Sequence, residues 1–476
     1  MIEKEFQGGR FPDKRLAQRL TKIAVKAAQD PRASFPQIAR SDSELEAIYR
    51  FLSNSRVRME AILEPHQEAT LARMARHDRV AVVHDSTQFA FRNDVGERLG
   101  YLPGPGQRGI VGHFALAVDE EGVPLGVLGF EALTPPAPRP RRRGKKHRLY
   151  DRTSLQKLAA RWGRLVRTVR DRIDGRTSVI HVMDREADSY ELMHDIAEAN
   201  ESFVIRLRHR DRIARGASDE IDDWRPVEQV ATRGHFFAKR EVAVSTRRHS
   251  KDQTYKRRYP ERDRRVAKLR IEALPVVFKK PGVIRFEPHL PRSINVNIVR
   301  VWEPSPPPGE EPIEWLLITN EPIGTPRQVE AVVDWYRRRW KIEEYFKALK
   351  TGCAFERRQL QTRTGLVNTL ALLAPIAWQL LALRDQGRKA PTAPARTVLS
   401  QQQLQVLSGL SKRPLPRKPS VEQALLAIAA QGGHLKRNGP PGWQTLGRGL
   451  EKLWWAEMGY QLGRAEALGH KGKCDR

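Results

Sequence analysis

Cysteine is scarce in this sequence of 476 residues, which contains only Cys353 and Cys474. Two cysteines exclude a disulfide framework, and they also exclude a zinc site built from several thiolates. The first residues, MIEKEFQGGRFPDKR, include no apolar run like that of a secretory signal. We therefore expect a protein of the cytosol.

Acidic residues are also few relative to basic ones, with 56 against 85 and a formal net charge of +29. The basic excess is spread along the chain and is not confined to one tail. Such a charge balance predicts a polyanionic partner, and nucleic acid is the commonest one. At this length the chain is expected to form about two to four domains.

Long hydrophobic runs are limited to one segment, Leu366 to Leu383. It reaches the lower length limit for a membrane span, about 17 residues. It also contains Asn368, Pro375 and Gln379, and the sequence has no second segment of this kind. We interpret it as a buried core helix, with a transmembrane helix as the alternative, and we expect no membrane partner.

Residues 1–70 are expected to form a small helical domain. Leu16, Leu20 and Ile23 share one face of a predicted helix whose other faces are basic. A second helix is predicted to begin at the capping box Ser41-x-x-Glu44. Two short helices with a basic surface suit a module that binds DNA ends, and the alternative is a solvated helical hairpin.

The middle of the chain alternates predicted strands and helices. A strand at 79–84 ends at Asp85, and a strand at 178–183 ends at Asp184. A hairpin follows the first strand, and helices separate the later ones. This order predicts an α/β fold in which helices cover a mixed sheet.

Domain borders follow from the same pattern. We assign residues 71–383 to the α/β core, with an all-β insertion at about 208–320, and residues 384–476 to a helical C-terminal domain. A proline-rich basic linker occupies residues 135–148. It is either a phosphate-binding arm or a solubilising loop.

Residues 325–350 are predicted to form one helix that lines a cleft. Thr325 and Gln328 form a capping box, and proline occupies the first helical position. One stripe of this helix carries Tyr336, Arg339, Trp340, Glu343, Lys347 and Lys350. These polar residues continue the apolar stripe, which is expected of a helix that leaves a core. The alternative is a salt-bridged surface helix, since Glu343 and Lys347 are spaced i,i+4.

Asp85, Asp184 and Glu343 together offer a set of oxygen ligands. Two carboxylates at the ends of neighbouring strands and a third on a crossing helix suit Mg²⁺ or Mn²⁺. Two such ions, about 3.5–4 Å apart, activate an attacking oxygen and stabilise the leaving oxygen in phosphodiester chemistry. Each aspartate alone also fits a turn former or a helix cap. No pattern supports Ser-His-Asp or Cys-His catalysis, or a P-loop.

These residues resemble the signature of a known family. The segment Tyr336-x2-Arg339-x3-Glu343-x6-Lys350 is similar to the Tyr-Arg-Glu-Lys signature of DDE transposases of the insertion-sequence-four group, the Tn-five-like cut-and-paste transposases. His84-Asp85-Ser86-Thr87 and Asp184-Arg185-Glu186-Ala187-Asp188 resemble the segments that hold the family's two catalytic aspartates. EAIYRFLSN, the segment from Trp315 and the segment from Trp443 also fit. The resemblance therefore spans essentially the whole chain, in the same order.

The resemblance implies a fold and a set of site residues. The fold would be an RNase H-like, retroviral integrase-like catalytic core with the β insertion, an N-terminal domain that reads transposon ends and a C-terminal domain for dimerisation and synapsis. Asp85, Asp184 and Glu343 would be catalytic and would hold two Mg²⁺ or Mn²⁺ ions. The implied DNA-binding residues are Tyr336, Arg339, Trp340, Lys347, Lys350, Trp315 and Arg206.

The resemblance also implies a function. The protein would bind double-stranded DNA at transposon ends, cut it through a hairpin intermediate, and join the 3′-OH ends to target DNA. It would act as a homodimer in a synaptic complex in the bacterial cytoplasm, at the nucleoid. Trp315, at the start of an apolar strand, is either a core residue or the residue that holds a flipped base. The alternatives are a catalytically silent DNA-binding inhibitor and a metal-dependent, structure-specific nuclease.

Overall fold

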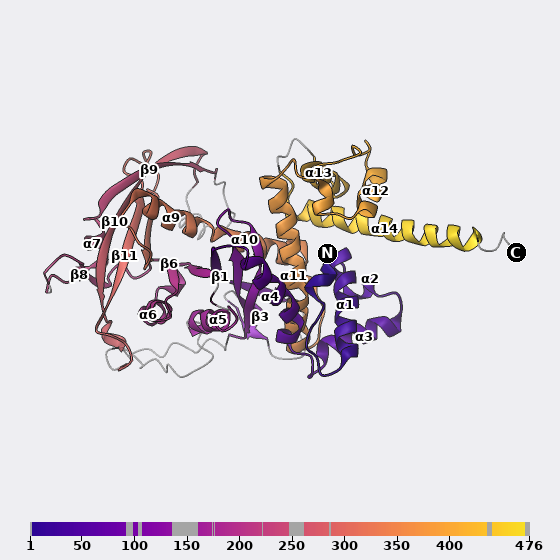
Figure 1. Cartoon of the computed structure of the whole chain (residues 1–476), viewed down its shortest axis with the longest axis horizontal. Helices are drawn as coiled ribbons and strands as arrows, with labels where there is room; N and C mark the ends of the chain where they lie inside the picture. Colours follow the sequence, from indigo (N-terminus) through magenta and orange to yellow (C-terminus); the bar gives the residue numbers. More distant parts are fainter. Residues whose placement is uncertain are drawn as a thin grey trace. The chain divides into compact units, whose positions relative to one another are not determined.

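The chain forms two compact units in a computed structural model (Figure 1). The first unit comprises Met1–His77, Ser86–Leu158 and Lys341–Arg476, and the second comprises Asp78–Asp85 and Ala159–Trp340. The structure describes residues 2–91, 99–102, 107–135, 160–173, 175, 177–220, 222–246, 261–284, 287–435 and 440–471. The predicted basic linker 135–148 lies outside the described residues beyond its first position.

The second unit is built on a mixed sheet. Its strands are the first half of β1 (Arg79–Phe91), β5 (Ser178–Met183), β6 (Ser202–Arg206), β7 (Ile213–Gly216), β8 (Arg225–Pro226), β9 (His235–Val244), β10 (Arg265–Lys279), β11 (Ser293–Trp302) and β12 (Glu314–Thr319). Their order is β1-β5-β6-β12-β11-β10-β7-β8, with β9 also paired to β10. The β1–β5 and β5–β6 pairs are parallel, and β6–β12, β12–β11 and β11–β10 are antiparallel. The predicted α/β class with a mixed sheet is therefore confirmed.

Helices cover this sheet. They are α5 (Arg161–Arg170), η3 (Arg185–Ala187), α6 (Tyr190–Glu198), α7 (Val227–Ala231), η4 (Gly282–Ile284) and α9 (Pro326–Arg337). The core cluster of this unit joins Trp162 of α5 and Tyr190 of α6 to Phe203 of β6 and Phe278 of β10. Continuous burial of Val80 through Val83 is typical of a parallel strand that is covered on both faces.

The stretch at 208–320 is rich in strands but not purely β. It forms β7 to β12, of which β9, β10 and β11 are long ribbons (Figure 1), and it also includes the short helices α7 and η4. Val227, Val230 and Ala231 of α7 are buried in the core cluster of the second unit. A five-residue helix of this kind is too short to give a periodic signal in the sequence.

The first unit is mostly helical. Its N-terminal part contains η1 (Ile2–Glu5), α1 (Lys14–Gln29), α2 (Phe35–Ile38), α3 (Asp42–Ser53) and α4 (Met59–Met74). Strands β2 (Gly100–Tyr101), β3 (Arg108–Val118) and β4 (Pro124–Leu133) follow, in the order β2-β3-β1, with β4 also paired to β3. The later part contains α10 (Trp340–Lys347), η5 (Ala348–Gly352), η6 (Phe355–Arg357), α11 (Arg363–Lys389), η7 (Ala395–Thr397), α12 (Gln401–Leu410), α13 (Val421–Gln431) and α14 (Trp443–Lys471).

The apolar run forms most of α11, a helix of 27 residues. By length and composition alone this helix could cross a membrane, but 72% of its most apolar window is buried inside the protein. Asn368 donates from Nδ2 to the carbonyls of Leu52 at 2.8 Å and Val57 at 3.0 Å, so its amide is satisfied by the chain itself. These contacts support the interpretation as a core helix.

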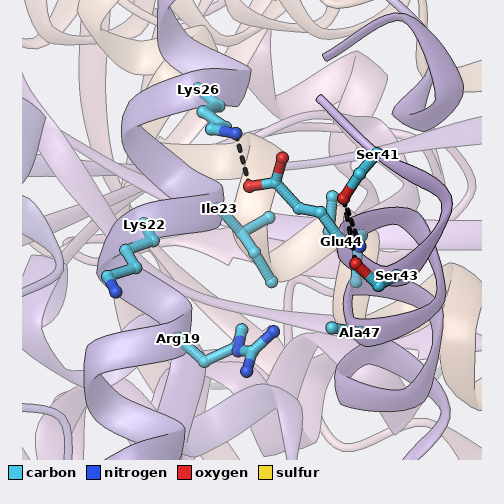
Figure 2. Close-up of a pocket in the computed structure, with 9 residues that line it drawn as sticks. Arg19, Lys22, Ile23, Lys26, Ser41, Ser43, Glu44 and Ala47 are labelled. Carbon is cyan, nitrogen blue, oxygen red and sulfur yellow. Dashed lines mark hydrogen bonds and ion pairs between the residues drawn. The ribbon is translucent and has the colours of Figure 1, made fainter. Parts of the chain in front are cut away.

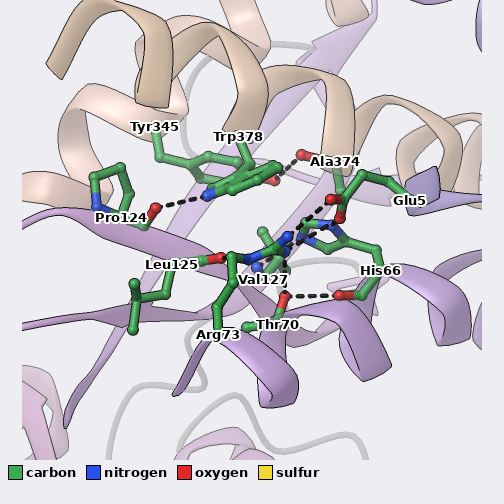
Figure 3. Close-up of polar contacts among 10 residues, drawn as sticks. All are labelled: Glu5, His66, Thr70, Arg73, Pro124, Leu125, Val127, Tyr345, Ala374 and Trp378. Carbon is green, nitrogen blue, oxygen red and sulfur yellow. Dashed lines mark hydrogen bonds and ion pairs between the residues drawn. The ribbon is translucent and has the colours of Figure 1, made fainter. Parts of the chain in front are cut away.

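A buried polar network holds η1 to α4 (Figure 3). Val127 N–H donates to Nε2 of His66 at 2.9 Å, so the other ring nitrogen carries the proton and lies 2.5 Å from Glu5 Oε2. Arg73 donates to Glu5 Oε1 at 2.8 Å, and its guanidinium stacks 4.2 Å from the ring of Trp378. Burial raises the pKa of Glu5, but His66 and Arg73 outweigh burial and lower that pKa to about 2.

This network predicts a pH-dependent loss of stability in Glu5→Gln. The pKa of Glu5 is about 2 in the folded protein against 4.5 in a model peptide, so its ionised form stabilises the fold above about pH 4.5. That stabilisation is lost as the pH falls toward about 2. At pH 7 the free energy of unfolding of the variant should be about 3 kcal/mol lower than that of wild type, because the buried ion pair loses one of its charges.

The measurement is urea unfolding at pH 7 and pH 3 with Glu3→Gln, at an exposed site, as control. The gap between Glu5→Gln and wild type should shrink at pH 3, and the control should match wild type at both values. An equal gap at both pH values would show that the charge of Glu5 is not what stabilises η1.

Candidate active site

Parallel pairing places the two predicted aspartates level with each other. Val80 pairs with Val179 and Val83 with Val182. Continued by two residues, the same register sets Asp85 opposite Asp184. Adjacent strands lie about 4.8 Å apart, which suits two carboxylates that share a cation. The strand that carries Asp85 does not end at 84, as the sequence pattern predicted, but continues as β1 to Phe91.

Asp184 occupies a partly desolvated position at the end of β5. Its Oδ1 accepts a hydrogen bond from Glu186 N–H at 2.8 Å, so it is also the N-cap of η3. Burial raises the pKa of Asp184, against the Glu186 N–H and the charges of Arg339 and Arg161, which lower it. The capping role that the sequence left open is therefore present.

Arg339 supplies positive charge to both aspartates. Its Nη1 lies 2.8 Å from Oδ2 of Asp85, and the two side chains are 11% and 17% exposed. The same guanidinium acts electrostatically on Asp184 and on the hydroxyl of Tyr336. One cation thus serves a cluster of two carboxylates and a phenol.

Tyr336 and Trp315 form the aromatic side of this cluster. Their ring centroids are 5.5 Å apart in an edge-to-face arrangement. Tyr336 is buried, and this burial raises its pKa, while Arg339 and Arg206 act in the opposite direction. Trp315 is half-buried. Seven predicted site residues belong to the second unit: Asp85, Asp184, Arg206, Trp315, Tyr336, Arg339 and Trp340.

The predicted helix 325–350 is broken in the structure. The capping box of Thr325 and Gln328 is present, but α9 ends at Arg337 and a new helix begins at Trp340. The break turns Arg339 inward, where it is 9% exposed, while Trp340 beside it is 54% exposed. The prediction that these side chains form one stripe is wrong. The residue spacing carries no information about Asp85, the distant acid that pairs with Arg339.

The remaining predicted residues lie in the first unit. Glu343 and the exposed Lys347 are on α10, and Lys350 is on the π-helix η5. Lys350 is partly buried, and its ammonium lies 5.5 Å from the ring centre of Phe89. Burial lowers the pKa of Lys350, and the nearby Glu356 carboxylate only partly offsets this. The predicted triad is divided between the two units, so its assembly stays a prediction.

A different group of metal-capable side chains was not predicted from the sequence. His77, Asp119 and Glu121 offer ligand atoms within 4.8 Å of one another. Asp119 is committed to the β3–β4 turn, where it accepts from Val123 N–H at 2.7 Å. A histidine and two acids that are this far apart in the sequence give no spacing signal, and none of them belongs to the predicted triad.

A basic pocket of about 420 Å³ lies between α1 and α3 (Figure 2). Its lining consists of Arg19, Lys22, Ile23, Lys26, Ser41, Ser43, Glu44, Ala47 and Ile48. Lys26 forms an ion pair with Glu44, whereas Arg19 and Lys22 have no acidic partner among the residues that the structure describes. The sequence indicated a basic helical surface here but not a pocket. Arg19 and Lys22, beside the hydroxyl groups of Ser41 and Ser43, suit an anion such as phosphate.

Comparisons with known proteins identify two domains. Residues 1–57 match the family described as transposase DNA-binding, and residues 157–378 match the transposase DDE domain. The first range contains the basic pocket, and the second contains Asp184 and Glu343 but not Asp85. The chain is also similar to a solved structure, the cryo-EM structure of a piggyBac transposase synaptic complex with hairpin DNA. That match covers 80% of this chain and 68% of the other, with 10% identity and a TM-score of 0.34, too low to support any conclusion.

The environment of Lys350 predicts a stabilising substitution. Burial opposes its charge, so Lys350→Met should raise the melting temperature of the first unit by about 1–2 °C. The gain should disappear as the pH rises toward 10.5, the ordinary lysine pKa, because wild-type Lys350 then loses its charge as well. The measurement is calorimetric unfolding beside Lys347→Met, an exposed control that should leave the melting temperature unchanged. A lower melting temperature for Lys350→Met would show that contacts to the ammonium outweigh its burial.

Proposed function

Because this chain is a DDE transposase with a transposase DNA-binding domain and a transposase DDE domain, we propose that it moves DNA by a cut-and-paste reaction. Asp85, Asp184 and Glu343 form its catalytic site. The observation that supports this proposal is the parallel register of β1 and β5, which continued by two residues brings Asp85 beside Asp184, together with the ion pair of Asp85 with the buried Arg339. Glu343 follows that arginine by four positions in the chain.

We further propose that the core is RNase H-like and that the chain belongs to the insertion-sequence-four group. Support comes from β1, which lies beside β3 of the β3–β4 hairpin and, through its first half, beside parallel β5, which in turn pairs with β6. We also propose the domain roles expected from the sequence: residues 1–70 bind transposon ends, 71–383 form the core, and 384–476 mediate dimerisation and synapsis. Exposed Trp455 and Tyr460 on α14 support an interaction role for the C-terminal helices.

The residues fit divalent metal ions. The donors are carboxylate oxygens, which Mg²⁺ and Mn²⁺ prefer. Asp184 is desolvated enough to raise its pKa, and Asp85 already pairs with a cation, so both sites favour positive charge. Asp85, Asp184 and Glu343 would hold two ions. When bound, such ions supply Lewis-acid stabilisation of the charge that develops on the phosphate and its leaving oxygen.

Other side chains bind and orient the DNA. Tyr336, Arg339 and Lys350 contact phosphates beside the bond that is cut, and Lys347 and the exposed Trp340 contact the flanking duplex. The pocket between α1 and α3 binds a backbone phosphate of the transposon end, with Arg19 and Lys22 as its cations. The overall charge of +29 adds affinity that depends on salt and not on sequence.

The reaction runs through a DNA hairpin. Water cuts one strand and leaves a 3′-OH on the element and a 5′-phosphate on the flanking DNA. The 3′-OH attacks the phosphodiester of the opposite strand, which expels the 3′-oxygen of the flanking strand and closes the duplex end. A second water opens the hairpin and frees the 3′-OH again, which then attacks a target phosphodiester and expels a target 3′-oxygen. A tight bend of this kind forces a base out of the stack, which costs a few kcal/mol. Trp315, half-buried and held edge-on by Tyr336, receives that base.

The test of this function is an end-cleavage assay. Purified protein and Mg²⁺ are incubated with DNA that carries the inverted repeats flanking the gene, and the cuts are mapped on each strand. The proposal expects cuts at the repeat ends, hairpins on the released segment and joining to added target DNA. Cutting without joining would indicate a structure-specific nuclease, and binding without cutting would indicate a silent inhibitor.

The carboxylate site predicts a separation of binding from chemistry. Asp184→Asn keeps an oxygen that can accept from Glu186 N–H but loses the charge that a metal ion requires. Cleavage should fall by about a thousandfold or more, the equivalent of several kcal/mol of lost Lewis-acid stabilisation. End binding, measured by gel shift without metal, should stay near wild type. Glu186→Gln, two residues away, is the matched control. If Asp184→Asn cleaves DNA as fast as Glu186→Gln does, the assignment of Asp184 is refuted.

The aromatic pair predicts a step-specific defect. Stacking of an extruded base on an aromatic ring returns about 1–3 kcal/mol, and it does so only after the first nick. Trp315→Ala should therefore slow hairpin formation about tenfold or more, while first-strand nicking stays close to normal. Single-turnover cleavage on a denaturing gel resolves the two products.

Trp315→Phe serves as the matched control, because it keeps an aromatic ring that can contact Tyr336. It should form hairpins at a rate near that of wild type. If nicking and hairpin formation instead fall together in Trp315→Ala, and its melting temperature drops by several degrees, Trp315 is a core residue.

A further inference from the structure

Arg339 occupies a carboxylate that the proposed function also assigns to a divalent ion. Its Nη1 is 2.8 Å from Oδ2 of Asp85, and its charge also favours the ionised form of Asp184. These are the carboxylates that the proposed function assigns to divalent ions. A guanidinium has five donors and no acceptor, so it cannot join a metal's ligands. A divalent ion on the other oxygen of Asp85 would lie within a few Å of the guanidinium and repel it, so Arg339 and a metal ion compete for Asp85.

The need for a cation in the unloaded site is electrostatic. Two carboxylates at neighbouring strand positions in a partly desolvated site repel each other. Arg339 places a positive charge against Asp85, and the 2.8 Å contact between its Nη1 and Oδ2 orients that carboxylate. Its position is enforced, because α9 ends just before it and the side chain is only 11% exposed.

A second partner for Arg339 lies close at hand. Its guanidinium carbon is 5.2 Å from the ring centroid of Trp340, whose side chain is 54% exposed. Stacking on an aromatic face keeps a guanidinium favourable as it leaves an ion pair. A short rotation along that ring would carry the charge from Asp85 toward solvent, where a phosphate with matching bidentate geometry can receive it.

We propose that Arg339 is an exchangeable counter-ion, which pairs with Asp85 in the metal-free protein and transfers to a DNA phosphate when a divalent ion takes its place. This inference rests on the proposed function. It makes metal and DNA binding mutually reinforcing, since DNA stabilises the released arginine and metal stabilises the vacated carboxylate. By linkage, each ligand raises the affinity for the other by the same factor. The metal site would then be filled chiefly when DNA is in place.

The test measures Mn²⁺ binding by electron paramagnetic resonance, with and without a pre-cleaved end duplex. The duplex ends in a free 3′-OH, and no target DNA is present, so no reaction occurs. For wild type, the Kd for Mn²⁺ should fall at least about fivefold on adding DNA. For Arg339→Gln, the DNA-free Kd should already be at least about fivefold lower than wild type, and DNA should change it less than about twofold.

Arg161→Gln is the matched control. The charge of Arg161 also acts on Asp184, and Arg161 forms an ion pair with Glu186 at 2.5 Å. Its loss removes the same charge, so it should leave the DNA-dependent fall in Kd intact. Arg339→Lys keeps the charge and should retain part of the coupling. If calorimetry in EDTA shows that Arg339→Gln does not fold, Arg339→Lys is used in its place.

Three results would overturn the exchange. The first is an Arg339→Gln variant with the same DNA-dependent change as wild type, and the second is an equal gain in metal affinity from Arg161→Gln. In either case, if Asp184→Asn still weakens Mn²⁺ binding, the proposed metal site is retained. The third is that Asp184→Asn binds Mn²⁺ with the same affinity as wild type. That result would contradict both the proposed function and the exchange.

Discussion

The parallel pairing of β1 with β5 is the constraint on which the rest of the site depends. It buries Val80 to Val83, and its register, continued by two residues, would set Asp85 opposite Asp184. Two carboxylates held this close create a demand for positive charge. Arg339, at the break between α9 and α10, supplies positive charge through its 2.8 Å contact with Asp85.

Several side chains here oppose the stability of the fold. Burial raises the pKa of Asp184 and lowers that of Lys350, so each is held in surroundings that disfavour its charge. Such residues are expected where function requires them. The network of Glu5, His66 and Arg73 acts in the opposite sense, because its charges are matched and buried together. It fixes η1, inside the range that matches a transposase DNA-binding domain, to α4 and β4.

Sequence reasoning reached those features that are local or periodic. Thr325 and Gln328 form their capping box, the strand at 178–183 ends before Asp184, and the apolar run is a core helix. It failed where a distant partner decides the geometry. Arg339 is 254 residues from Asp85, and no helical period predicts that this pair will accompany a break in the helix. The pocket between α1 and α3 was missed for the same reason, since its lining comes from two helices.

The most direct test of the account is to locate Mn²⁺ in crystals of the protein bound to a pre-cleaved end duplex, by anomalous scattering. The account predicts two peaks, about 3.5–4 Å apart, coordinated by Asp85, Asp184 and Glu343, with the Arg339 guanidinium away from Asp85. Peaks confined to His77, Asp119 and Glu121, with Arg339 still paired to Asp85, would contradict it.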